Sequence, residues 1–152
     1  MNADVQLVAF RLDDRRYGLP LASVDRVVRI VDITPLPNAP EVVLGVINVQ
    51  GRVIAVVDVR KRFRLPERVS TLSDSLIIAR TPARAVALVA DSVAGVVECS
   101  EGETVPAQAI VPGMEYVEGV VKLSDGMLLI HDLARLLSLD EERRLNEAIA
   151  ND

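Results

Sequence analysis

The chain has few of the residues on which several common kinds of site depend. Among its 152 residues there are two Phe, two Tyr and no Trp, so aromatic residues make up only 3% of the sequence. Proteins that bind single-stranded nucleic acid usually stack bases on aromatic side chains within a basic groove. With so few aromatic residues and a net charge of −5, the composition excludes nucleic acid as an expected partner.

Cysteine and histidine are almost absent. A single cysteine, Cys99, cannot form an intramolecular disulfide, which fits a reducing compartment. One histidine, His131, and one cysteine without any repeated ligand spacing do not suggest a zinc site. We therefore expect no metal and no cofactor. Cys99 is expected to be buried or half-buried and inert, and His131 to be packed within a strand.

Membrane-spanning and catalytic patterns are also missing. No apolar run approaches the roughly 20 residues that span a bilayer, and the N-terminus has no signal-peptide pattern, so we expect a cytoplasmic protein without direct membrane insertion. No glycine-rich phosphate loop is present. Asp58 and Asp132 occupy matching places but lack the glycine-containing loops of aspartic proteases, so each is expected to cap the turn or helix after its strand. We expect the protein not to be an enzyme. The competing hypothesis is a small hydrolase that resembles an aspartic protease.

Aliphatic residues are abundant instead. Half of the chain is hydrophobic, and its valine-rich segments alternate with the period of a strand. In the segment 5–12, for example, Val8, Phe10 and Leu12 share one side. Further strands are expected within 16–31, 45–49 and 53–59, with a turn at "QGR" and a short helical turn in "RKRFRL". The fold class is therefore mainly β.

The two halves of the sequence repeat one plan. "GVINVQGRVIAVVDVRKRF", from Gly45, matches "GVVKLSDGMLLIHDLARLL", which begins 74 positions later, and residues 7–30 match residues 76–99 with an offset of 69. The five extra residues fall in the loop 100–115. Each unit of about 65 residues would be marginal alone, so we expect two small barrels that pack together. Their approximate bounds are 5–65 and 74–139, joined by the polar connection 66–74.

The C-terminal residues 140–152 predict a helix and tail. Ser138 or Asp140 can cap the helix, and Leu139, Leu145 and Ile149 form a thin apolar stripe. A basic cluster precedes the connection between the halves. We expect it to be a solvated face, with a docking surface as the alternative; its members are Arg60, Lys61, Arg62 and Arg64.

Two pairs of valines stand at matching places in the repeats. Val24 and Val27 in the first half correspond to Val93 and Val96 in the second. At the junction of two barrels they could line an apolar groove that accepts an amphipathic helix or a helical hairpin. They could equally be core residues, and the sequence leaves both interpretations open.

The sequence resembles the CheW family, the adaptors of bacterial chemosensory arrays. The resemblance covers about residues 5–145. It rests on four segments in order: "LVAFRLDDRRYGLPLASVDRVV", "LPNAPEVVLGVINVQGRVIAVVDVRKRF", "ALVADSVAGVVEC" and "YVEGVVKLSDGMLLIHDLARLL". It implies one CheW-like domain over 5–139, built as two five-stranded SH3-like β-barrels related by a pseudo-twofold, with a C-terminal helix.

The resemblance also implies a function. Members of the family have no catalytic activity and join the cytoplasmic tip of a methyl-accepting chemoreceptor to the regulatory domain of a CheA-type histidine kinase. The chain is thus expected to be recruited to receptor arrays. By resemblance, a kinase-binding surface includes Leu44 and Gly45, and the receptor-binding groove includes Val24, Arg26, Val27, Asn48, Gln50, Gly51, Val93 and Val96.

Two positions depart from the family pattern. Gln50 stands where the family usually has Arg, and Arg26 stands where an acid is common. The first change removes a guanidinium and the second reverses a charge, and partner choice often depends on such charges. The departures suggest a divergent adaptor for a dedicated receptor and kinase. It would act in a non-flagellar pathway that controls pili, biofilm or development. The alternative is an SH3-like binding module for an unrelated protein partner.

Overall fold

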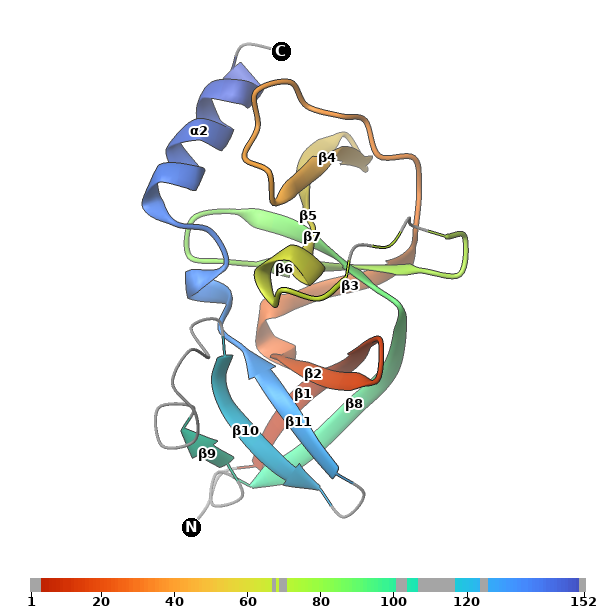
Figure 1. The fold of residues 1–152 in the computed structure, drawn as a ribbon. Helices are drawn as coiled ribbons and strands as arrows, with labels where there is room; N and C mark the ends of the chain where they lie inside the picture. Colours follow the sequence, from red (N-terminus) through yellow and green to blue (C-terminus); the bar gives the residue numbers. More distant parts are fainter. Residues whose placement is uncertain are drawn as a thin grey trace.

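A computed structural model describes residues 4–66, 68, 71–100, 104–106, 117–123 and 126–150. Two β-sheets lie one above the other, and a helix lies beside the upper one (Figure 1). Most of the loop 100–115, where the five extra residues of the second repeat were expected, lies outside the described residues, as do parts of the connection 66–74 and the last two residues of the tail.

Each sheet is dominated by antiparallel strands. Sheet A has six strands, in the order β8 (Ser92–Ser100), β1 (Asp4–Leu12), β2 (Arg15–Pro20), β11 (Gly126–His131), β10 (Val117–Leu123) and β9 (Thr104–Pro106). Sheet B has five, in the order β3 (Val24–Arg29), β6 (Ser75–Arg80), β7 (Ala85–Ala90), β5 (Arg52–Val57) and β4 (Val43–Val49). The helical segments are η1 (Leu21–Ser23), α1 (Val59–Arg62), η4 (Leu133–Arg135) and α2 (Leu139–Ala150). The expected mainly β fold with a C-terminal helix is confirmed.

The sheets exchange strands between the two halves of the sequence. The hairpin β1–β2 of the first half joins strands of the second half in sheet A, where β2 pairs in parallel with β11. The hairpin β6–β7 of the second half joins strands of the first half in sheet B, where β7 pairs in parallel with β5. The sheets therefore do not coincide with the expected units 5–65 and 74–139, because alternation within a strand indicates its buried faces but not its partner strand.

The internal repeat is confirmed by the strand registers. Val8 lies opposite Leu19 in β1–β2, and Ile77, 69 positions after Val8, lies opposite Leu88 in β6–β7. The second offset holds as well. A register shift between Val43 and Gly45 in β4 recurs 74 positions later between Val117 and Gly119 in β10. The two sheets are therefore equivalent structures, each completed by a hairpin from the other half.

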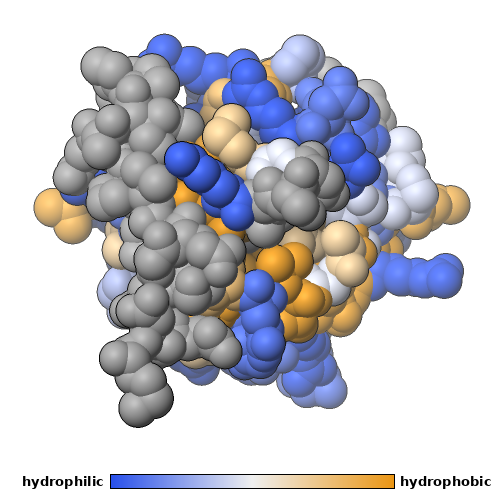
Figure 2. Space-filling view, turned by 90° about the horizontal axis from the view of Figure 1, so that it is seen from below, coloured by the Kyte–Doolittle hydropathy of each residue, from blue (hydrophilic) through white to orange (hydrophobic). Residues whose placement is uncertain are grey.

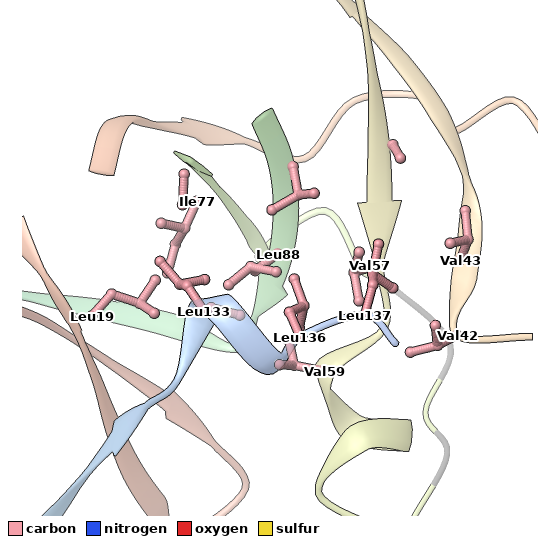
Figure 3. Packing of buried hydrophobic residues seen from close by; sticks show 14 of the residues in the cluster. Leu19, Val42, Val43, Val57, Val59, Ile77, Leu88, Leu133, Leu136 and Leu137 are labelled. Atoms are coloured by element: carbon pink, nitrogen blue, oxygen red, sulfur yellow. The ribbon is translucent and has the colours of Figure 1, made fainter. Parts of the chain in front are cut away.

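Exchanged strands bury both of their faces. In β1, Leu7 and Ala9 lie in a cluster inside sheet A, while Phe10 and Leu12 lie in a larger central core shared by the two sheets. Sheet B has its own interior cluster, which contains Leu76 and other residues. Figure 3 shows the central core, where Leu19 of β2 and Ile77 and Leu88 of sheet B meet Leu133 and Leu136, which follow β11. Burial of this apolar surface joins the two sheets.

The C-terminal helix begins with a capping box. The amide of Glu141 donates to Ser138 Oγ (3.1 Å), and the amide of Ser138 donates to Glu141 Oε1 (2.9 Å). Leu145 is buried as expected, but Leu139 is 91% exposed and Ile149 is also exposed. Ala148 completes the buried side instead. The expected apolar stripe is thus correct only at Leu145. Among the described residues, no helix is both long and apolar enough to cross a bilayer.

Candidate functional site

The four matched valines lie on two equivalent strands. In β3, Val24 lies opposite Ala79 and Val27 lies opposite Ile77; both partners face the central core. Because cross-strand neighbours share a face, Val24 and Val27 lie on the side of sheet B that faces the central core. In β8 of sheet A, Val93 takes the corresponding place opposite Phe10.

The exposed fractions of these valines separate the two interpretations left open by the sequence, a surface groove and a buried core. Val24 and Val93 are half-buried and pack against the central core. By contrast, Val27 is 42% exposed and Val96 is 54% exposed. The outer pair therefore contributes little to the core and is exposed to solvent. Seen from the end formed by sheet A, the molecule exposes hydrophobic atoms between hydrophilic side chains (Figure 2).

The polar residues expected beside the groove lie on the β4–β5 turn and on β3. Gln50 (φ 50°) and Gly51 (φ 82°) form a two-residue hairpin turn in which both residues are left-handed. Asn48 supports the turn, since its Oδ1 accepts from the Gly51 amide (2.8 Å). On β3, Arg26 is exposed and its Nε lies 3.4 Å from the carboxylate of Asp25. An exposed pair of this kind contributes little to stability, so Arg26 can exchange this neighbour for a partner's charge.

The expected kinase-binding residues offer little side-chain surface. Leu44 is half-buried and packs against the interior cluster of sheet B. Gly45 is buried, and the neighbouring Val46 exchanges two backbone hydrogen bonds with Thr34 (2.8 and 2.9 Å). Gly45 thus determines the shape of the strand, and any contact made there involves mainly backbone and adjacent side chains.

The expectation that the basic cluster is a solvated face is wrong for Arg60, which is only 7% exposed. Its Nη2 lies 2.7 Å from Asp13 Oδ1 and 2.6 Å from Asp91 Oδ2. Arg68 lies 2.6 Å from the other Asp91 oxygen and 2.8 Å from Asp74. This ionic cluster of Arg60, Asp13, Asp91, Arg68 and Asp74 joins the β1–β2 turn of sheet A to α1 and the connection before β6.

The other basic residues behave differently from one another. Arg62 forms a largely buried ion pair with Glu141 of α2. Lys61 is exposed and donates to the carbonyl of Glu41 (3.1 Å). Arg64 is exposed. Half of the basic cluster thus holds the fold together, which leaves little of it as a docking surface.

Charges in the ionic cluster stabilise one another. Burial alone would raise the pKa of Asp91, but the Asp13 amide and the guanidinium groups of Arg60 and Arg68 lower it below its ordinary value. A hydrogen bond from Arg60 to Asp13 likewise raises the pKa of Arg60, against an opposing effect of burial. Asp91 is therefore ionised at neutral pH.

This ionic cluster has no counterpart across the repeat. Pro82, Ala22 and Ala134 occupy the positions that correspond to Asp13, Asp91 and Arg60, and none of them carries a charge. A pocket of about 560 Å³ lies there instead. It is lined by Pro20, Ser23, Arg80, Thr81, Pro82, His131, Asp132, Leu133 and Ala134. The two sides of the junction are thus structurally equivalent but chemically different.

His131 is buried at this pocket, within an aromatic row. Its ring is nearly perpendicular to that of Phe63, with ring centroids 5.0 Å apart, and Phe63 stacks on Tyr17 with centroids 4.5 Å apart. Neither ring nitrogen has a well-formed hydrogen bond to the described residues. Burial lowers the pKa of His131 to about 4, an effect only partly offset by the backbone of Asp132. His131 is therefore neutral at pH 7, as expected of a packed strand residue.

The depressed pKa of His131 predicts a pH-dependent stability. The unfolded chain binds this proton near pH 6.5 and the folded chain only near pH 4, so stability decreases as the pH falls through that interval. The full difference is about 3 kcal/mol. Valine is the residue at the equivalent position of the first half, Val57. In urea titrations at pH 7 and pH 4.5, we expect the free energy of unfolding to decrease less for His131→Val than for the wild type. Equal losses in both proteins would contradict the prediction.

Asp58 and Asp132 have the capping role expected of them. Asp58 Oδ1 accepts from the Arg60 amide (3.0 Å), and Asp132 Oδ1 accepts from the Ala134 amide (3.2 Å). Each side chain thus starts the helical turn after its strand. The described residues include no group of three or more His, Cys, Asp or Glu that could hold a metal ion. Cys99 is buried, as expected.

These observations define a class of protein: two linked β-sheets whose candidate site is an exposed surface with apolar and polar side chains. Comparisons with known proteins identify it further. The family model described as CheW-like domain matches residues 6–141, so the chain belongs to the CheW family. Its function is that of a non-enzymatic chemosensory scaffold, and its fold consists of two SH3-like barrels.

Relatives match along nearly their whole length. The chain is 28% identical to the chemotaxis protein CheW of Treponema pallidum over 146 residues, with 92% of this chain and 86% of the relative covered. It is 28% identical to CheW of Rhizobium meliloti, with 92% of both proteins covered. The crystal structure of the scaffolding protein TtCheW from Thermoanaerobacter tengcongensis superposes with a TM-score of 0.84 at 31% identity, covering 91% of this chain and 96% of that one.

Proposed function

We propose that this protein couples the cytoplasmic tip of a methyl-accepting chemoreceptor to the regulatory domain of a CheA-type histidine kinase. The proposal depends chiefly on the exposure of Val27 and Val96 at equivalent positions of the two sheets, next to the half-buried Val24 and Val93. In this role the protein is cytoplasmic and is recruited to receptor arrays.

The valines suit a helical partner. An amphipathic helix binds a groove through an apolar stripe, and the exposed valines offer apolar surface on both sides of the junction. Polar contacts around it would come from Asn48 of β4, from the turn residues Gln50 and Gly51, and from the exposed Arg26. Binding of a receptor tip here would change the free energy of the kinase contact, which is coupling rather than chemistry.

The kinase contact is proposed near Leu44 and Gly45 of β4. This strand is the last strand of sheet B in the order of pairing, and the buried Gly45 gives it a local irregularity in register. A partner with the same kind of barrel would dock on this shape rather than on protruding side chains.

The charges at the receptor edge are the basis for proposing a divergent pathway. Gln50 and Arg26 are both exposed, so substituting them changes the surface and not the core. If they select a dedicated receptor, Gln50→Arg with Arg26→Glu would weaken binding to the cognate receptor tip. Unchanged affinity would remove the basis for a non-flagellar pathway controlling pili, biofilm or development.

The proposed function is tested by calorimetric titration against every CheA-type regulatory domain of the source genome and against a receptor tip. We expect Val27→Glu to weaken receptor-tip binding by about tenfold or more, because a charge replaces apolar contact surface. Since Val27 is 42% exposed, we expect it to lower the free energy of unfolding by less than about 1 kcal/mol.

The matched control is Leu72→Glu, because Leu72 is 91% exposed and lies outside the proposed groove. It should leave both stability and receptor binding unchanged. A strongly destabilised Val27→Glu protein would instead place Val27 in the core. A folded wild-type protein that binds neither a kinase domain nor a receptor tip would favour the alternative, an SH3-like module for an unrelated partner.

A further inference from the structure

The C-terminal helix α2 covers one flank of sheet B. Arg84, at the start of β7, donates from Nε to Glu142 of α2 (2.7 Å), and its Nη2 donates to Asn146. The side chains of Arg84 and Glu142 are both less than one-fifth exposed. Leu145 and Ala148 on the same helix enter the central core. This flank of sheet B thus binds an amphipathic helix in two ways. Arg84 pairs with a carboxylate of the helix, and the apolar side of the helix packs on the central core.

The equivalent flank of sheet A carries the same kind of residues without a helix from the described part of the chain. Arg15 precedes Arg84 by 69 positions, and Leu129 follows Ala55 of β5 by 74 positions. Since Leu129 lies beside Tyr17 in the same register as Ala55 beside Val86, the two flanks correspond. Figure 1 shows α2 alongside sheet B and, among the described residues, no corresponding helix against sheet A.

In place of a helix, sheet A has a pocket of about 610 Å³, lined by Arg11, Asp14, Arg15, Arg16, Gly126, Met127 and Leu129. Among these described lining residues, three guanidinium groups and one carboxylate give a positive balance. Met127 is 62% exposed and Leu129 is half-buried, so the pocket also has an apolar side. Methionine adapts its shape to a docked side chain, and arginine pairs well with a carboxylate.

The first half of the chain supplies no equivalent of α2 for this flank within the residues that the structure describes. The segment that corresponds to α2 in the first half is 65–76. It contains Pro66, which cannot donate a backbone hydrogen bond, and it ends inside strand β6. Its described residues contain no helix. Among the described residues, then, no segment of the first half provides a helix for this flank of sheet A.

We propose that the flank of sheet A around Arg15, Met127 and Leu129 is a docking site for an acidic amphipathic helix of a partner protein. The helix places a carboxylate against Arg15, as Glu142 lies against Arg84, and lays its apolar side on Leu129. Met127 lies at the edge of this contact, since the equivalent Val53 is 62% exposed beside α2. This site is separate from the valines of β3 and β8, and the proposal does not depend on the receptor and kinase contacts proposed above.

The helix α2 provides the probe. A fluorescent peptide of residues 138–152, linked between positions 143 and 147 to hold it helical, is titrated against the full-length protein. We expect Arg15→Glu to weaken its binding by about tenfold or more, and a peptide with Glu142→Lys to restore binding to that variant. The control Arg29→Glu changes an exposed arginine outside the pocket and should leave affinity unchanged.

Amide chemical shifts identify where the peptide binds. Shift changes at Met127 and Leu129 support the proposal. Shift changes confined to the residues around Arg84 would show that the peptide displaces α2 from sheet B, and this result overturns the proposal. Absence of binding, or binding that is insensitive to Arg15→Glu, also overturns it. A concentration-dependent dimer that Arg15→Glu abolishes would assign the flank to a second copy of this chain instead of a partner.

Discussion

Replacing Gly45 by alanine is expected to lower the free energy of unfolding by about 3 to 5 kcal/mol, through a backbone clash and a strained dihedral angle. A Cβ at this position would lie 2.2 Å from the carbonyl oxygen of Thr34. Thr34 cannot retreat easily, because its amide and its carbonyl are both hydrogen-bonded to Val46. The φ of +156° adds a conformation that residues with a side chain rarely adopt. Urea denaturation at neutral pH measures the loss.

Gly51→Ala separates the clash from the dihedral angle. Gly51 also has a positive φ, but a Cβ added there would have no other atom within 4 Å. Its replacement should cost only about 1 kcal/mol. Similar losses for both variants would show that the contact with Thr34 is not the cause. Because Gly45 is also part of the proposed kinase surface, loss of kinase binding by an unfolded Gly45→Ala protein would say nothing about that surface.

The second large effect is expected at Arg60. Arg60→Met keeps most of the aliphatic volume but leaves Asp13 and Asp91 without this guanidinium, and we expect a loss of about 3 kcal/mol. The side chain of Asp13 is 42% exposed, so water can solvate its carboxylate when Arg60 is removed. The expected loss of stability is therefore at the low end of the range for a buried ion pair. Arg143→Met is the control, since its pairs with Asp140 and Glu147 are exposed. It should leave the free energy of unfolding essentially unchanged.

Acid should reduce the difference between wild type and Arg60→Met. The folded pKa of Asp91 is lowered, so its contribution is complete above its unfolded pKa near 3.8 and is lost as the pH falls through the folded value. Below that pH the carboxyl is neutral and the guanidinium no longer matters to it. A difference that stays constant from pH 7 to pH 2 would show that Arg60 acts through packing alone.

Local features were predicted well from the sequence, because they depend on nearby residues. Alternation located the strands, and the glycine after Gln50 located the hairpin turn. Ser138, one of the two candidate caps, lies at the start of α2. The duplication was also visible, since equivalent positions retain similar residues in both halves. Asp58 and Asp132 were identified as caps by their place directly after strands.

Features that depend on distant residues were missed. The exchange of hairpins could not be predicted, because β1 and β6 bury both faces and either sheet could satisfy their alternation. Arg60 was expected in solvent because its carboxylate partners are 31 and 47 residues away in sequence. One signal was present: Asp13 and Asp91 have uncharged counterparts in the other half, so the two halves differ in charge where Arg60 binds.

The exchange of hairpins has a consequence for synthesis on the ribosome. Sheet B needs strands only up to β7, which ends at Ala90, whereas sheet A needs β11, which ends at His131. Of the two exchanged hairpins, β1–β2 is synthesised before β6–β7 but belongs to the sheet that is completed last. Until then Phe10, Leu12, Tyr17 and Leu19, all fully buried in the folded protein, lack part of their final packing. The nascent chain therefore carries a hairpin with incompletely buried hydrophobic residues until β11 has been synthesised. Aggregation or chaperone binding is most favoured during this period.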